Sequence, residues 1–419
     1  MFVKFCTAPD RLLQSFLLLK ALNSRLGLPH APPLPKKWNN GEEKNMGYRE
    51  TYESWKSDPE AFWMEQAKSI DWITPPSTAL TDHGDNLYEW YADGMVNGCY
   101  NAVDRHVENG RGDQLAIIYD SPISNKKEKI TYSQLKTRVA NLAGALAARG
   151  VEKGDTVIIY MPMIPQALEA MLACARLGAI HSVVFGGFAA HELAVRIDDC
   201  TPKVIIAASC GLEPGRIVEY KPLLDDAILQ SAHKPEFCLI YQREEHPCEM
   251  IEGRDIDWND AQRGGMPAAC IPVEGNFPAY ILYTSGTTGA PKGVVRPTGG
   301  HLVALNWTMK NIYNVDPGDV FWAASDVGWV VGHSYICYGP LIHGNTTVVF
   351  EGKPIGTPDA GTSDAGTSDA KTQSYINAAT VDEYLKNQCT NEKLDELSKK
   401  LDDITDQMQD QNEKMEMSN

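Results

Sequence analysis

One segment decides the fold of this chain: Tyr283-Thr284-Ser285-Gly286-Thr287-Thr288-Gly289-Ala290-Pro291-Lys292-Gly293. It continues an apolar, β-prone run, Ala279–Tyr283, so the pattern predicts a strand that ends in a loop rich in Gly, Ser and Thr. Glycines let the backbone approach an anion, backbone N–H groups and hydroxyls donate hydrogen bonds, and Lys292 adds a positive charge. The segment predicts a phosphate-binding loop. It is not a Walker A motif, because Gly293 follows the lysine, and an ordinary surface loop is the alternative.

The composition is that of a globular protein with room for more than one domain. The chain has 419 residues and a net charge of −17, with a large share of the acidic excess after Glu351. This balance argues against nucleic-acid binding, which needs a basic face. The ten cysteines are scattered without a C-x-x-C pair or a metal-ligand spacing, so we expect reduced thiols and predict no metal site. No apolar run reaches the length of a membrane span.

Residues 1–40 differ from the rest of the chain. They hold an apolar, basic, acid-free run from Arg11 to Leu26, followed by a proline-rich stretch. This pattern predicts a mitochondrial presequence and a matrix location. A weak secretory signal and a disordered N-terminus of a cytoplasmic protein are the alternatives.

Strand and helix patterns alternate from Leu115 onward. Thr131 to Gln134 forms a capping box that predicts a helix ending at Gly150. Further predicted helices are 165–178, 191–199 and 333–341, and predicted strands are 115–119, 156–160, 180–185, 204–208, 320–324 and 346–350. Such βαβ units predict an α/β fold with a mainly parallel sheet. The aromatic-rich region before them predicts a packed helical lead-in.

Three further strings share their pattern with a known group of enzymes: Val294–His301, Ala324–Tyr335 and Tyr338–Leu341. Together with the phosphate-binding segment, they resemble the adenylate-forming (AMP-binding) enzymes, in particular the acetyl- and propionyl-CoA synthetase branch. The resemblance implies a partial large N-terminal domain with parallel-rich sheets flanked by helices. It divides this region into an acetyl-CoA-synthetase-type segment at residues 45–106 and a partial AMP-binding domain at residues 107–355.

The same resemblance implies an activity and a set of site residues. The activity is that of a short-chain acyl-CoA synthetase, a propionate/acetate–CoA ligase that uses ATP, CoA and Mg²⁺. Its phosphate contacts fall on Thr284, Ser285, Gly286, Thr287, Thr288, Gly289 and Lys292, with Lys292 as the catalytic residue that neutralises phosphate charge. Its CoA contacts fall on Glu213, Pro214, Gly215 and Arg216, and its acyl pocket on Trp329, Val330 and Val331.

Several of these residues also have a simpler interpretation. Without the resemblance, Arg216 is a surface charge. His333 either polarises the substrate carboxylate or is a buried core histidine. We expect Asp104, Arg105 and His106 to make structural polar contacts rather than catalytic ones.

The resemblance ends near Gly361. Residues 356–380 contain a repeated Gly-Thr-x-Asp-Ala pattern, and their composition predicts a flexible linker. The pattern of residues 381–419 predicts an acidic amphipathic helix or short coiled coil. A coiled-coil partner is therefore expected through residues 390–417. The family's later motifs, among them the Mg²⁺ ligands and a catalytic lysine in a C-terminal small domain, are not found. Two hypotheses remain: an active ligase, or a catalytically incomplete form that acts as a binding or interaction protein.

Overall fold

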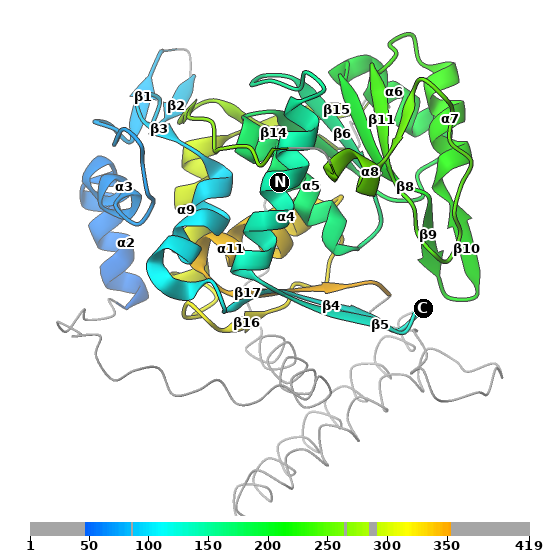
Figure 1. Ribbon diagram of the computed structural model, residues 1–419. Helices are drawn as coiled ribbons and strands as arrows, with labels where there is room; N and C mark the ends of the chain where they lie inside the picture. Colours follow the sequence, from blue (N-terminus) through cyan, green and yellow to red (C-terminus); the bar gives the residue numbers. More distant parts are fainter. Residues whose placement is uncertain (1–46, 85–86, 264–265, 285–290, 353–419) are drawn as a thin grey trace, which may run out of the picture. The chain divides into compact units, whose positions relative to one another are not determined.

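A computed structural model describes the chain at residues 47–84, 87–263, 266–284 and 291–352 (Figure 1). These residues belong to one structural unit within residues 42–362. The predicted presequence, the linker at 356–380 and the C-terminal helix at 381–419 lie outside the described residues. Residues 285–290, the middle of the phosphate-binding segment, also lie outside them.

The main sheet has seven strands in the spatial order β12-β11-β8-β6-β7-β14-β15 (Figure 1). All neighbouring strands are parallel except β14 and β15, which form an antiparallel hairpin at one edge. The predicted parallel α/β sheet is therefore confirmed. The strands are β6 (Thr156–Tyr160), β7 (Ile180–Val184), β8 (Val204–Ala208), β11 (Phe237–Tyr241), β12 (Asp255–Asp257), β14 (Pro278–Thr284) and β15 (Lys292–Pro297).

Helices cover both faces of this sheet, and β6 shows why. Its side chains alternate between two apolar clusters: Val157 and Ile159 pack with α4 (Tyr132–Ala147) and α5 (Pro165–Leu177). Ile158 and Tyr160 pack with α6 (Ala190–Cys200) and α7 (Tyr220–Gln230). A strand buried on both faces needs the continuous apolar run that its sequence has.

The sequence signals that begin α4 and that begin and end α5 are confirmed, whereas α4 ends at Ala147, three residues before the predicted Gly150. Thr131 Oγ1 accepts a hydrogen bond from the Gln134 N–H at 3.2 Å, and Gln134 Oε1 accepts one from the Thr131 N–H at 2.9 Å, so the capping box opens α4. Pro165 begins α5, and Gly178 ends it in the left-handed conformation with φ +69.

A second sheet has four strands in the order β16-β17-β4-β5, and only β4 and β5 are antiparallel. Its strands are β4 (Leu115–Ser121), β5 (Lys126–Thr131), β16 (Val320–Phe321) and β17 (Thr346–Phe350). The strand predicted at 320–324 is thus correct in place but ends at Phe321. The helix predicted at 333–341 is part of a longer helical stretch made of α10 (Val330–Gly332), η3 (His333–Tyr338), a π-helix, and α11 (Gly339–His343).

The helical lead-in predicted for the aromatic-rich region is only partly correct. Helices α2 (Tyr48–Ser57) and α3 (Pro59–Ala67) begin it, but short strands follow before the π-helices η1 (Tyr100–Asp104) and η2 (Val107–Arg111). Trp63, Trp90 and Trp307 pack edge to face there, so the tryptophans form a core between these elements and α9 (Thr298–Asn311).

The remaining elements are short. They are β1 (Leu80–Asp82) paired with β2 (Tyr88–Trp90), β3 (Met95–Val96) paired with β13 (Val273–Glu274), β9 (Cys210–Glu213) paired with β10 (Arg216–Glu219), and α8 (Trp258–Gln262). Within the ranges that the structure describes, every helix is too short or too polar to cross a bilayer.

Candidate functional site

The phosphate-binding segment begins and ends on a β-hairpin. Thr284 is the last residue of β14, Lys292 is the first of β15, and the two are directly paired. Both side chains are exposed. The segment between them, with Ser285, Gly286, Thr287, Thr288 and Gly289, lies outside the described residues. The hairpin fixes its two ends at the carboxyl end of β14, beside the carboxyl end of the parallel strand β7.

Helix α6 holds the end of β14 in place. The Tyr283 hydroxyl donates a hydrogen bond to Asp199 Oδ2 at 2.6 Å. The Arg196 guanidinium lies over the Tyr283 ring, 5.5 Å from its centroid, and over the Phe188 ring at 5.0 Å. Cation–π contacts of this kind join the end of β14 to the loop that follows β7.

That loop, Phe185–Ala189, lies where the strand order reverses. From β6 the chain moves to β7 on one side, then crosses to β8 on the other. In open α/β sheets, the crevice outside the carboxyl ends at such a reversal is where ligands bind. Gly186 and Gly187 make the loop compact, and a Cβ atom at Gly186 would clash with the Tyr220 hydroxyl. We call residues 185–189 the switch loop.

Tyr220 connects the switch loop to the β9–β10 hairpin. A Cβ atom at Gly211 in β9 would also clash with the Tyr220 hydroxyl, so this side chain lies between the two glycines. Its ring packs on Tyr160 with centroids 4.8 Å apart, and the Tyr160 hydroxyl donates to the Phe188 carbonyl at 3.0 Å. The base of the hairpin is therefore packed against the switch loop.

The predicted CoA-contact residues occupy the turn of this hairpin. Glu213 ends β9, Arg216 begins β10, and Pro214 and Gly215 form the turn, with Gly215 at φ +77. Arg216 Nε donates to Glu213 Oε2 at 2.8 Å, and the two side chains are 67% and 40% exposed. Because Arg216 is at the tip, only the base of the hairpin reaches the switch loop. Figure 1 shows the hairpin extending away from β8.

The predicted acyl-pocket residues approach the switch loop from the other side. The Trp329 ring contacts the Phe185 ring with centroids 5.9 Å apart, and a Cβ atom at Gly328 would lie 2.8 Å from Phe185 Cα. Trp329, Val330 and Val331 are 53%, 42% and 45% exposed, so they present an open apolar surface. Exposed large apolar side chains grouped in this way mark a binding surface.

Asp326 begins the turn that presents Trp329. It is partly buried, and its Oδ1 accepts a hydrogen bond from the Gly328 N–H at 2.7 Å. Burial raises the pKa of the Asp326 carboxyl to about 6. The carboxyl group fixes the backbone turn that brings Trp329 against Phe185.

His333 lies behind this surface, in the core. Its Nδ1 is 2.9 Å from the Trp329 carbonyl oxygen, and its ring packs against Tyr280 and His181. Burial lowers the pKa of His333 to about 4, so the ring is neutral at pH 7. Of the two interpretations of His333, the structure favours the core histidine.

The predicted structural roles of three neighbouring polar residues are confirmed. Asp104 pairs with Arg176, the Arg105 Nη2 donates to the Ile342 carbonyl at 2.5 Å, and His106 Nε2 is 2.8 Å from the Leu341 carbonyl oxygen. All three side chains are buried. They join the N-terminal segment to α5 and to α11.

The structure thus brings two of the three predicted groups to the switch loop: Trp329 contacts Phe185, and Tyr283 at the end of β14 is linked to Phe188 through Arg196. The predicted CoA-contact residues 213–216 lie at the tip of the β9–β10 hairpin, and only the base of that hairpin packs against the switch loop. The sequence motifs did not identify Phe185 or Phe188 as site residues. Two phenylalanines enclosing Gly186 and Gly187 directly after a buried strand were the available signal.

Comparison with known proteins agrees with this architecture. The family model of AMP-binding enzymes matches residues 103–362, and that of the acetyl-coenzyme A synthetase N-terminus matches residues 48–102. This chain belongs to the AMP-binding enzyme family.

Individual relatives narrow the comparison to one branch. The chain is 58% identical over 305 residues to rat acyl-CoA synthetase short-chain family member 3, mitochondrial. The matched region covers 73% of this chain and 45% of the relative. It is 46% identical over 328 residues to the acetyl-coenzyme A synthetase of Xanthobacter autotrophicus, covering 77% of this chain and 50% of the relative. It is 43% identical over 350 residues to the propionate–CoA ligase of Escherichia coli, covering 83% and 55%. The chain therefore spans about half the length of these relatives.

Proposed function

We propose that this chain carries the acid-activating part of a short-chain acyl-CoA synthetase and that its switch loop is the centre of the site. One observation carries the proposal: the end of β14, the Trp329 surface and the base of the β9–β10 hairpin are all packed around residues 185–189. An acid-activating enzyme needs three ligands side by side, namely a nucleotide, a carboxylic acid and a thiol. The end of β14 and the Trp329 surface would serve the nucleotide and the acid, and the β9–β10 hairpin would carry its CoA contacts at its tip.

The reaction we propose has two steps. An oxygen of the carboxylate attacks the α-phosphorus of ATP, the bond to the bridging oxygen breaks, and pyrophosphate leaves as acyl-AMP forms. The thiolate of CoA then attacks the acyl carbon, and AMP leaves with the former acyl–oxygen bond electrons. Such transfers depend mainly on positioning and charge neutralisation. Lys292 and the loop that begins at Thr284 would neutralise the departing pyrophosphate.

Trp329, Val330 and Val331 would receive the acyl chain. A bulky ring beside two small aliphatic side chains suits an acid of two or three carbons, and two of the relatives are named for acetate and propionate. One methylene group changes the binding free energy by only about 1–3 kcal/mol, so both acids would be substrates and would react at different rates.

Arg216 at the tip of the β9–β10 hairpin would contact a phosphate of CoA. Arginine presents several fixed N–H donors, and Arg216 is exposed enough to exchange Glu213 for a phosphate. Glu213 would then position the guanidinium in the free protein.

We assign no residue of the described ranges to Mg²⁺. The one group of three potential ligands found there, Cys99, Asp104 and Cys270, contains two thiols, and Mg²⁺ prefers oxygen. No step of the proposed reaction is therefore attributed to a metal held by these residues. The name of the rat relative and the basic N-terminal run support a mitochondrial location, and we propose the matrix.

Propionate-dependent exchange between ATP and labelled pyrophosphate tests the proposal, with acetate and butyrate in parallel. The account predicts exchange with propionate and acetate, less with butyrate, and a large loss in Lys292→Ala. Lys68→Ala is a matched control, because Lys68 is also exposed and lies in the N-terminal segment beside Glu65.

The alternative is a binding protein without this chemistry. It predicts no acid-dependent exchange from folded protein, together with retained binding of ATP or CoA. That result would reject the ligase proposal for this chain and leave its family membership unchanged.

A further inference from the structure

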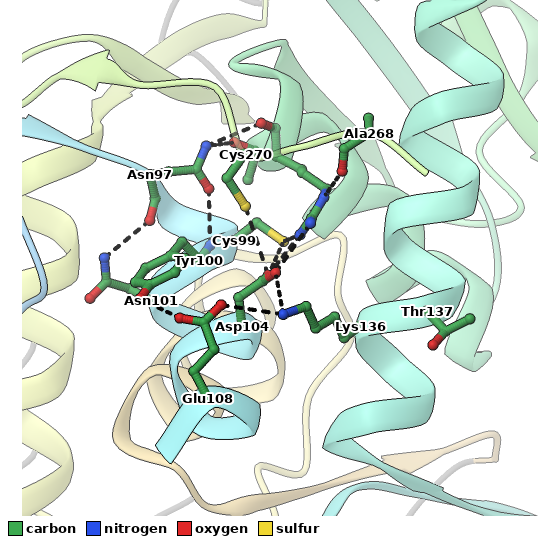
Figure 2. Close-up of polar contacts among 12 residues, drawn as sticks. Asn97, Cys99, Tyr100, Asn101, Asp104, Glu108, Lys136, Thr137, Ala268 and Cys270 are labelled. Carbon is green, nitrogen blue, oxygen red and sulfur yellow. Dashed lines mark hydrogen bonds and ion pairs between the residues drawn. The ribbon is translucent and has the colours of Figure 1, made fainter. Parts of the chain in front are cut away.

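Two cysteines far apart in the sequence meet at the junction of the N-terminal segment with α5. Cys99 precedes η1 and is fully buried, and Cys270 lies in the segment before β13 and is half-buried. Their sulfur atoms and a carboxylate oxygen of Asp104 all lie within 4.8 Å of one another. Figure 2 shows both thiols directed toward Asp104.

Polar contacts fix this arrangement from three sides. The Cys99 and Cys270 sulfurs are 4.0 Å and 3.8 Å from Asp104 Oδ2. Arg176 donates from Nη1 to Asp104 Oδ2 at 2.7 Å and from Nη2 to Oδ1 at 3.1 Å, and its Nη1 is 3.5 Å from the Cys99 sulfur. Lys136 is 3.2 Å from Asp104 Oδ1.

The segment that carries Cys270 is held at both sides of the cysteine. The Arg176 Nε donates to the Ala268 carbonyl at 2.6 Å, and the Asn97 amide donates to the Ile271 carbonyl at 2.7 Å (Figure 2). These contacts hold the backbone on both sides of Cys270, so the fold keeps its sulfur close to that of Cys99.

A metal ion is the first occupant that such a group suggests, but the charges oppose it. Both oxygens of Asp104 already accept hydrogen bonds from Arg176, and Lys136 adds a second positive charge. A divalent cation that binds Asp104 would have to displace the Arg176 and Lys136 side chains, and their positive charges would repel it.

We propose that Cys99 and Cys270 form a redox-active thiol pair that closes to an intramolecular disulfide when the chain meets a hydroperoxide. The half-buried Cys270 is the sulfur that the oxidant reaches, and Cys99 is the resolving thiol. The hydrogen bond with Cys99 and burial raise the pKa of the Cys270 thiol, so the reaction is slow and needs sustained oxidant.

The chemistry balances with hydrogen peroxide as the oxidant. The Cys270 sulfur attacks one peroxide oxygen, the O–O bond breaks, and the thiol proton leaves with the other oxygen as water, giving a sulfenic acid. The Cys99 sulfur then displaces the hydroxyl group, which takes the Cys99 proton and leaves as a second water. The two thiols lose two electrons in total, and the peroxide gains them.

The disulfide would leave the ligand surface intact. Arg176 lies in the last turn of α5, which runs back from the carboxyl end of β6 toward the amino ends of the strands. The thiol pair is therefore at the opposite end of the sheet from the switch loop. A bond between Cys99 and Cys270 would link the N-terminal segment to the segment before β13. It would also stabilise the fold, because a disulfide that closes a long loop restricts the unfolded chain.

The test is peptide mapping of the purified chain after millimolar hydrogen peroxide, with free thiols blocked by iodoacetamide. We expect a peptide pair joined through Cys99 and Cys270 that dithiothreitol separates. Cys99→Ser and Cys270→Ser should each abolish the pair while keeping a hydroxyl donor for Asp104. Cys248→Ser is the control, because Cys248 is also half-buried and lies beside Gln242 rather than a second thiol.

A thermal melt adds a readout that does not depend on the mapping. The oxidised chain should melt several degrees above the reduced chain, and this difference should vanish in Cys270→Ser. Oxidation of Cys270 to sulfinic acid without the linked peptides would overturn the proposal. So would recovery of one zinc ion per chain that Cys270→Ser releases, since that result would identify a metal site.

Discussion

Two arginine–carboxylate pairs in this chain have the same chemistry and opposite surroundings. Arg216 and Glu213 meet at the tip of the β9–β10 hairpin, with side chains 67% and 40% exposed. Arg176 and Asp104 meet between α5 and η1, with side chains 6% and 5% exposed. An exposed pair contributes about 0–1 kcal/mol, whereas removing one partner of a buried pair costs about 3–5 kcal/mol.

The difference separates recognition from architecture. Arg216 can exchange its partner for a ligand at little cost, so it suits a binding role. Arg176 also holds the Ala268 carbonyl and lies beside two thiols, so it organises a junction between distant segments. The proposed ligand surface is therefore built from exposed groups, whereas the Arg176–Asp104 pair is a buried part of the framework.

The largest effect is expected at the buried pair. Arg176→Ala leaves Asp104 buried with only Lys136 as a cationic partner, so unfolding should become easier by about 3–5 kcal/mol. Urea denaturation measures this as a lower midpoint with an unchanged slope. A loss below about 1 kcal/mol would mean that the junction does not depend on this ion pair.

The next effect concerns pH and the buried histidines. Burial lowers the pKa of His301 to about 3 and that of His333 to about 4, while the unfolded chain titrates near 6.5. Below pH 6.5 the unfolded state binds protons that the folded state does not, so stability falls as the pH drops toward 4. Each histidine contributes about 1.4 kcal/mol per pH unit in this window.

His301→Phe isolates that contribution. Burial raises the pKa of Glu169 to about 7 and of Asp326 to about 6, and these carboxyl groups stabilise the fold as the pH falls, opposing the histidines. We therefore expect the difference in the free energy of unfolding between the wild type and His301→Phe to change by about 1.4 kcal/mol per pH unit below pH 6. The pH slope of the wild type alone combines the histidines with these carboxyl groups. Equal pH slopes for the two proteins would show that His301 titrates normally in the fold.

A smaller loss of stability is expected at the start of α4, and its size lies between the effects expected at the two ion pairs. Thr131→Ala removes the acceptor for the Gln134 N–H at the start of α4 and should cost about 1 kcal/mol. Thr131→Ser keeps the oxygen and should restore most of the stability. If both variants lost the same amount, packing of the Thr131 methyl group rather than capping would be responsible.

The smallest effect on stability is expected at the exposed pair. Arg216→Ala should change the free energy of unfolding by less than about 1 kcal/mol but weaken CoA binding about tenfold, as loss of a charged hydrogen bond does. Arg263→Ala is the matched control, because Arg263 is also exposed and paired three residues away, with Asp260. Equal CoA dissociation constants for the two variants would remove Arg216 from the proposed site.

Much of the fold could be predicted from the sequence because its signals are local. The strands at 156–160, 204–208 and 346–350 agree with β6, β8 and β17, since continuous apolar runs mark strands buried on both faces. The strand β15 was missed because its pairing with β14 depends on the hairpin between them. The hairpin β9–β10 was missed because its residues alternate weakly and Ile217 is exposed.

The site was predictable only in pieces. Lys292, Arg216 and Trp329 each stood in a recognisable string, yet the placement of their elements around the switch loop depends on the strand order. Cys99 and Cys270 were counted among scattered thiols because 170 positions separate them. A long-range contact of this kind leaves no mark in local sequence patterns, and only the packing of η1 against the segment before β13 brings the sulfurs together.

The most direct test of the central claim is ATP binding by isothermal titration of the wild type, Lys292→Ala and Lys68→Ala. If the β14–β15 hairpin holds the nucleotide phosphates, Lys292→Ala should bind ATP at least about tenfold more weakly, and Lys68→Ala should match the wild type. Equal ATP affinity in all three proteins would contradict the assignment of Lys292 and, with it, the proposed phosphate site.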